Sequence, residues 1–135
     1  VYKGHYASIS EFPSIYYDRI RQLIPDKPIV FSEVGWPSGG AGSLQDQADF
    51  IAALPLLLKG VNPELVTWTM LHDVNFFRVE MLNETQTEIL KGFGLVPDEL
   101  FTELNTMGLL SWDGPPKPAW FNALNLHFNT GDWPP

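Results

Sequence analysis

The chain of 135 residues contains no cysteine. This absence excludes disulfide scaffolds, thiolate zinc sites and cysteine nucleophiles. Basic residues are few, since 8 Lys and Arg stand against 16 Asp and Glu, giving a formal net charge of −8. We therefore expect no nucleic-acid partner and no anionic membrane partner, because phosphate binding needs a surplus of Lys and Arg. The apolar stretch "IAALPLLL" is too short to span a bilayer. An uncharged substrate such as a sugar fits this composition.

The residues that are present favour one packed domain with helices and strands in alternation. Hydrophobic residues make up 44% of the chain, which is enough for a core. Apolar spacing and breaker residues predict strands over Ile29–Val34 and Leu65–Leu71. They predict helices over Glu11–Ile24, Pro97–Leu104 and Ala119–Phe128. A further helix is predicted to begin at Ser43, which forms a capping box with Asp46, and Pro55 is expected to kink or split it.

This order indicates a parallel α/β arrangement, with both strands buried on two faces. Two strands leave both sheet edges open, which is an association hazard. We therefore expect that the chain is either the C-terminal part of a larger α/β protein or a unit that assembles with copies of itself.

Glu33 is the first candidate for chemistry, because it ends a hydrophobic strand and is followed by "VGWPSGG". Counted by two from Ile29, the residues Ile29, Phe31 and Glu33 share one face of the predicted strand. The carboxyl ends of parallel strands are where sites are commonly built. A carboxylate there is costly unless it is paired or used. The alternative is a glutamate that makes a salt bridge at the start of a loop.

Further candidates follow the second strand and occupy the loops. Trp68 shares a face of the second strand with His72, and its indole can either stack on a sugar or belong to the core. His72 and Asp73 follow that strand and can either line a site or form hydrogen bonds within a loop. Trp36 and Trp112 lie in loops, where exposed indoles often line ligand sites, although Trp112 can instead anchor the Asp-Gly turn beside it. The less favoured positions are His5, Tyr6 and Trp133.

Three segments in order resemble one enzyme family. "PIVFSEVGWPSGG" resembles the seventh-strand nucleophile motif of clan A glycoside hydrolases, and is especially similar to family 17 β-1,3-glucanases and family 53-like galactanases. "LVTWTMLHD" resembles the eighth strand of that clan, and "MGLLSWDGPPKPAW" resembles its common ending. The resemblance implies an α/β fold, with residues 1–135 as the C-terminal portion (strands 7–8, helices 6–8) of a single (β/α)8 TIM-barrel catalytic domain.

The same resemblance implies roles for individual residues. Glu33 would be the catalytic nucleophile of a retaining glycoside hydrolase, and Trp36, Trp68, His72 and Asp73 would bind substrate. The peptide bond between Trp68 and Thr69 is predicted to be cis, as it often is in the clan. The resemblance implies a secreted protein that acts on β-linked polysaccharide or oligosaccharide, and no metal or other cofactor is predicted.

Retaining hydrolysis needs a second carboxyl group about 5–5.5 Å from the nucleophile. In the clan this acid/base follows an Asn more than a hundred residues upstream of the nucleophile, and only 32 residues precede Glu33 here. Asn83-Glu84 comes after Glu33 in the chain, whereas the acid/base of the clan comes before the nucleophile, and we interpret this pair as solvated surface. The missing N-terminal half of the barrel is thus a predicted partner, and the isolated chain is expected to be inactive. The alternatives are a non-catalytic carbohydrate-binding or interaction module and a transglycosylase.

Overall fold

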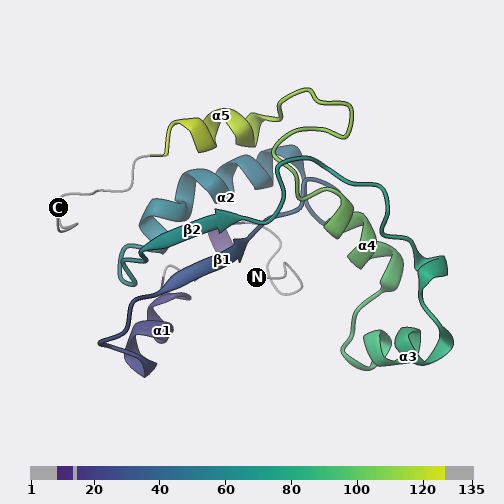
Figure 1. The fold of residues 1–135 in the computed structure, drawn as a ribbon, viewed down its shortest axis with the longest axis horizontal. Helices are drawn as coiled ribbons and strands as arrows, with labels where there is room; N and C mark the ends of the chain where they lie inside the picture. The colour runs from purple at the N-terminus through teal and green to yellow at the C-terminus, as the bar shows by residue number, and fades with distance from the viewer. Residues whose placement is uncertain (1–8, 14, 127–135) are drawn as a thin grey trace.

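The computed structural model describes residues 9–13 and 15–126, which hold five α-helices, two short 3-10 helices and one two-stranded sheet. The elements are η1 (Ile9–Glu11), α1 (Asp18–Leu23), β1 (Val30–Val34), α2 (Leu44–Leu57), β2 (Leu65–Trp68), η2 (Val79–Met81), α3 (Glu84–Gly92), α4 (Pro97–Asn105) and α5 (Pro118–Leu124). Figure 1 shows α2 lying over the two strands and α5 lying over α2. The helices α3 and α4 extend to the other side of the molecule, away from the strands.

Both predicted strands are present and pair in parallel, with Val30 opposite Leu65 and Val34 opposite Trp68, but β2 ends at Trp68 and not at the predicted Leu71. Between these pairs the register shifts, because β1 advances three residues from Phe31 to Val34 while β2 advances two. The extra residue is a β-bulge, which turns the side chains after it to the opposite face. Phe31 before the bulge and Val34 after it therefore both pack toward the core.

The expectation of the C-terminal portion of a TIM barrel is wrong. The described residues form a small mixed α/β domain whose single sheet has two strands. Barrel strands are buried on both faces, whereas Val30 and Leu65 are each more than half exposed on the face turned away from α2. The hydrophobic runs that suggested two-faced burial are thus packed on one side alone.

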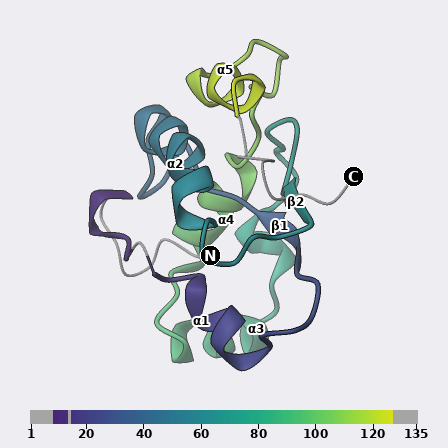
Figure 2. The ribbon, with the colours of Figure 1, turned by 90° about the vertical axis from the view of Figure 1, so that its left-hand side faces the viewer.

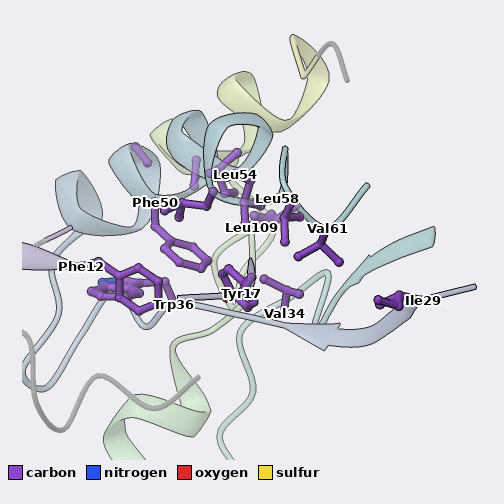
Figure 3. Packing of buried hydrophobic residues seen from close by; sticks show 14 residues of the cluster. Phe12, Tyr17, Ile29, Val34, Trp36, Phe50, Leu54, Leu58, Val61 and Leu109 are labelled. Atoms are coloured by element: carbon purple, nitrogen blue, oxygen red, sulfur yellow. The ribbon is translucent and has the colours of Figure 1, made fainter. Parts of the chain in front are cut away.

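The core lies between the sheet and α2 and extends to the aromatic residues near the beginning of the described chain. Trp36 stacks on Phe50 of α2 with ring centroids 4.8 Å apart, and Phe12 meets both rings edge-on. Figure 3 shows Phe12, Trp36 and Phe50 gathered at one end of the cluster. Tyr17 is also buried, and burial raises the pKa of its phenol, with the neighbouring Tyr16 adding to the effect. The aromatic side chains thus join the segment before β1 to the sheet and to α2.

Of the four predicted helices, α4 is confirmed and the other three need correction in part. Ser43 caps α2 as expected, and α4 matches its predicted range closely. However, α2 is not split at Pro55 and continues to Leu57, so the proline costs the hydrogen bond that its own N–H would have made without ending the helix. The helix α1 covers only the last part of Glu11–Ile24. The helix α5 ends at Leu124, and the predicted continuation to Phe128 lies partly outside the described residues.

Residues 74–106, which we call the helical arm, contain η2, α3 and α4. Its one buried residue is Pro97 at the start of α4. The arm joins the rest of the molecule at Asp73 and Val74 on one side and at Asn105 and Thr106 on the other. Figure 2 shows α3 and α5 at opposite ends of the molecule. In the ranges that the structure describes, no helix is long and apolar enough to cross a membrane.

Candidate functional site at the carboxyl end of the parallel strands

Glu33 lies at the bulge, one residue before the end of β1, and is exposed. Val34 beside it points into the core, so the bulge turns the Glu33 side chain away from that core. The predicted shared face of Ile29, Phe31 and Glu33 is therefore wrong for Glu33. The Glu33 carboxylate is therefore accessible to solvent and to a ligand.

The backbone that follows Glu33 is held by close contacts. A Cβ atom on Gly35 would lie 2.7 Å from Oγ1 of Thr69, so a side chain at this position would have to displace that of Thr69. The carbonyl of Trp36 accepts a hydrogen bond of 2.8 Å from Nε2 of Gln47, whose side chain is fully buried. The carboxyl end of β1 is thus fixed against both β2 and α2.

Trp36 does not contribute to a surface site. Its exposed fraction is 0%, and its ring stacks on Phe50 inside the core. The predicted role of Trp36 in substrate binding does not fit this position, because a fully buried indole presents no face to a ligand. The Gly and Pro residues around Trp36 suggested an exposed loop, but the loop folds back and inserts the ring under α2.

Trp68 is partly buried on the core side of β2. Its Nε1 atom donates a hydrogen bond of 2.7 Å to the carbonyl of Met107, and its ring lies 6.3 Å from that of Phe50. Trp68 therefore joins β2 to the segment after α4. The predicted cis bond to Thr69 is wrong, since no peptide bond between described residues is cis.

His72 and Asp73 follow β2 but have different surroundings. His72 is exposed, and its Nδ1 atom lies 3.5 Å from the carbonyl of Ser111. The Oδ1 atom of Asp73 accepts hydrogen bonds from Nζ of Lys117 at 2.5 Å and from the backbone N–H of Gly108 at 3.0 Å. His72 is thus open to a ligand, whereas one oxygen of Asp73 is already engaged inside the protein.

Lys117 is the most important residue near this site that the sequence did not reveal. Its side chain is only 4% exposed, and besides Asp73 it donates to Oγ of Ser38 at 2.8 Å and to the carbonyl of Thr106 at 3.3 Å. A buried ammonium needs an anion and further acceptors, and Lys117 has both. The available signal was its position between Pro116 and Pro118 at the beginning of the last helix, which restricts the backbone there.

The carbonyl of Thr106 collects donors from three parts of the chain. It accepts hydrogen bonds from the backbone N–H and the hydroxyl of Ser38, both at 3.0 Å, and longer ones from Gln47 and Lys117. Gln47 also donates to the carbonyl of Gly108 at 3.1 Å. We call Ser38, Gln47, Asp73, Thr106 and Lys117 the polar cluster, in which Gln47 and Lys117 are buried and the other three are partly buried. It joins the loop after β1, the helix α2 and both ends of the helical arm.

Trp112 is the described tryptophan whose ring is most open to solvent, with an exposed fraction of 61%. It lies in a turn in which Gly114 N–H donates to the carbonyl of Ser111 and Ser111 N–H donates to the carbonyl of Pro115. These backbone bonds hold the turn, so the indole is not needed to anchor it. The tryptophan that is available for stacking is therefore Trp112, and not Trp36.

Asn83 and Glu84 are exposed at the beginning of α3, as expected for solvated surface. Asn83 is the N-cap of this helix, in a capping box with Gln86. In the part of the chain that the structure describes, no three His, Asp or Glu side chains come together as a metal site would require. His5, Tyr6 and Trp133 lie outside the described residues.

Comparison with known proteins adds no family to this description. No protein-family model matches the chain, and no match was found among curated proteins or among solved structures. A functional proposal must therefore rest on the residues at the carboxyl end of the strands and on the motifs quoted above.

Proposed function

We propose that this chain carries the nucleophile, Glu33, of a retaining glycoside hydrolase that acts on a β-linked glycan. The acid/base carboxyl group comes from another polypeptide segment. The observation that supports the proposal best is the exposed position of Glu33 on a rigid strand end, because a nucleophile must be accessible and held in one place. The segment "FSEVGWPS" adds the resemblance to the nucleophile motif.

In the proposed reaction, a carboxylate oxygen of Glu33 attacks the anomeric carbon of the sugar. The new ester bond forms as the glycosidic C–O bond breaks, and the leaving oxygen departs with the bonding electrons. With a natural glycan this oxygen needs a proton from the second carboxyl group. Water then hydrolyses the ester and releases the sugar with its original anomeric configuration.

An activated substrate tests the nucleophile without the second carboxyl group. A 2-deoxy-2-fluoro-β-glycoside of dinitrophenol loses a phenolate that needs no proton, so attack by Glu33 alone leaves a stable glycosyl ester. The protein is incubated with the gluco, galacto and manno forms and is then digested for peptide mass spectrometry. We expect one of the three sugars to be attached to Glu33.

Two variants make this labelling experiment decisive. Glu33→Gln should remove the adduct, whereas Glu64→Gln should leave it, because Glu64 is an exposed glutamate at the opposite, amino end of the strands. If none of the three sugars labels Glu33, or if the label is found on other carboxylates equally, the nucleophile assignment fails.

A carbohydrate-binding module is the second candidate, and the exposed ring of Trp112 favours it. Such a module would bind the glycan with no covalent label on Glu33. The affinity of Glu33→Gln for the glycan would then equal that of the unchanged protein, and neither protein would show any turnover.

A further inference from the structure

We propose that Trp112 and His72 form a contact surface for a neutral β-glycan, with Trp112 as the stacking platform. This inference deepens the proposed function, on which it rests, by naming a place where the substrate chain is held apart from the nucleophile. It rests on the exposure of the indole, the stiffness of the turn that carries it, and the polar groups beside it.

Trp112 presents the largest flat ring among the exposed apolar side chains of the described residues, since it is the one tryptophan in that set. The other described tryptophans are buried or half-buried, whereas Trp112 is 61% exposed. A pyranose ring presents a face of C–H groups, and an indole is the side chain with the largest flat surface to cover it. A sugar ring can cover the indole face that the protein itself leaves open.

The backbone of the turn that carries Trp112 is held on both sides. Leu110 pairs with His72 on one side and with Pro116 on the other, and the N–H of Lys117 donates to the carbonyl of Leu109 at 3.0 Å. The side chain of Lys117 is in turn fixed by Asp73. A preorganised platform binds without the cost of ordering a loop, so this stiffness favours recognition.

Polar side chains belong to the neighbours of Trp112 and suit the hydroxyl groups of a sugar. His72 is exposed beside Ser111, and Asp113 is exposed next to Trp112 in the chain. An imidazole and a carboxylate both form hydrogen bonds with hydroxyl groups. Because the chain has a net charge of −8 and Asp113 adds a local negative charge, the ligand is a neutral glycan and not a uronic-acid polymer.

His72 follows the carboxyl end of β2, and Glu33 lies near the carboxyl end of the paired strand β1. His72 comes four residues after the end of β2, and β2 pairs through Trp68 with Val34, the neighbour of Glu33. An extended chain advances about 3.3 Å per residue, so His72 lies at most about 13 Å along the chain from the strand end. An oligosaccharide that reaches both places presents one sugar unit to Glu33 and another to Trp112.

The experiment is a titration of the full chain, labelled with nitrogen-15, with β-1,3-gluco-, β-1,4-galacto- and β-1,4-manno-hexasaccharide. The indole N–H signal of Trp112 is identified as the one lost in Trp112→Ala, and its shift is followed by NMR. We expect one hexasaccharide to shift this signal. Trp112→Ala should lower the affinity about tenfold, and Trp112→Phe, which keeps an aromatic ring, should restore part of the loss.

Phe93→Ala is the matched control, because Phe93 is also an exposed aromatic residue but is the C-cap of α3 in the helical arm. Its affinity for the hexasaccharide should not change. If no hexasaccharide shifts the Trp112 signal, or if Trp112→Ala and Phe93→Ala behave alike, the inference is overturned.

The labelling of Glu33 separates this inference from the proposed function. Labelling of Glu33 without a shift of Trp112 overturns the platform and leaves the nucleophile. A shift of Trp112 without labelling supports the platform and overturns the hydrolase in favour of a binding module. If both results are negative, both proposals fail.

Discussion

The sheet with its covering helices and the helical arm are held together in different ways. The cluster of fourteen buried hydrophobic residues includes none from residues 74–106, although these residues make up about a quarter of the chain. The arm instead relies on local contacts, such as the capping box of Asn83 and the stacking of Phe77 on Phe101. The difference teaches that regular secondary structure is no measure of how much a region contributes to global stability.

The two regions also differ in how they use charge. In the body of the protein, Lys117 and Asp73 form an ion pair that is largely buried. In the arm, Lys91 and Glu88 form an ion pair whose side chains are 59% and 66% exposed. Burial makes the first pair costly to break, whereas water and salt replace the second with little loss.

The largest difference between the regions should come from truncation of an aromatic residue. Trp36→Ala removes a fully buried ring that stacks on Phe50, and we expect a loss of about 3–5 kcal/mol in the free energy of unfolding. Phe93→Ala removes a ring that is 78% exposed and should change that free energy by less than about 0.5 kcal/mol. Urea denaturation followed by circular dichroism measures both. Equal losses would show that the arm is part of the cooperative core.

The two ion pairs offer a second comparison. Lys117→Met leaves the carboxylate of Asp73 with Gly108 but without its cation, and we expect a loss of about 3 kcal/mol. The matched variant Lys91→Met should cost about 0.5 kcal/mol or less. Both are measured by urea denaturation at low and high salt, and salt should affect only the pair in the arm.

A double variant then checks the cause of the larger loss. Asp73→Asn in the Lys117→Met background removes the unpaired charge and should recover part of the stability. If the double variant is less stable than Lys117→Met alone, the loss comes from packing and not from the stranded carboxylate.

The smallest effect concerns the two helix N-caps. Asn83→Ala removes the cap of α3, and Ser43→Ala removes that of α2, each with a local cost of about 1 kcal/mol. We expect Ser43→Ala to lower the free energy of global unfolding by that amount. Asn83→Ala should leave it nearly unchanged and should speed amide hydrogen exchange in Glu84–Gly92. Unchanged exchange in α3 would show that the capping box does not hold this helix.

Several elements could be predicted from the sequence because their signals are local. The parallel strands followed from short apolar runs between breakers, and the start of α2 followed from the hydroxyl of Ser43. The helix α3 was missed, although Asn83 and Gln86 are three positions apart, as the two residues of a capping box are. Here Asn takes the place of the more familiar Ser or Thr. The face of Glu33 was also missed, because a bulge depends on the pairing of two strands and leaves no mark in one of them.

The candidate site was harder to predict because its decisive features join distant segments. Trp36 lies between Gly and Pro, and Trp112 lies two residues before Gly-Pro, yet the first is buried and the second is exposed. Only the packing of Phe12 and Phe50 around Trp36 makes this difference. Lys117 and Asp73 are 44 positions apart, so neither residue indicates the other without the fold.

The two ends of the helical arm meet. The N–H of Val74 donates to the carbonyl of Asn105 at 3.0 Å, and the side chain of Asn105 bonds both the N–H and the carbonyl of Phe77. The polypeptide thus leaves the body and returns to it at a single point. A segment with this geometry is an exchangeable insert, since a chain of another length can start and finish at the same two positions. A segment of another length between residues 74 and 105 can therefore take the place of this one while Glu33, Trp112 and the polar cluster, including Thr106, keep their places.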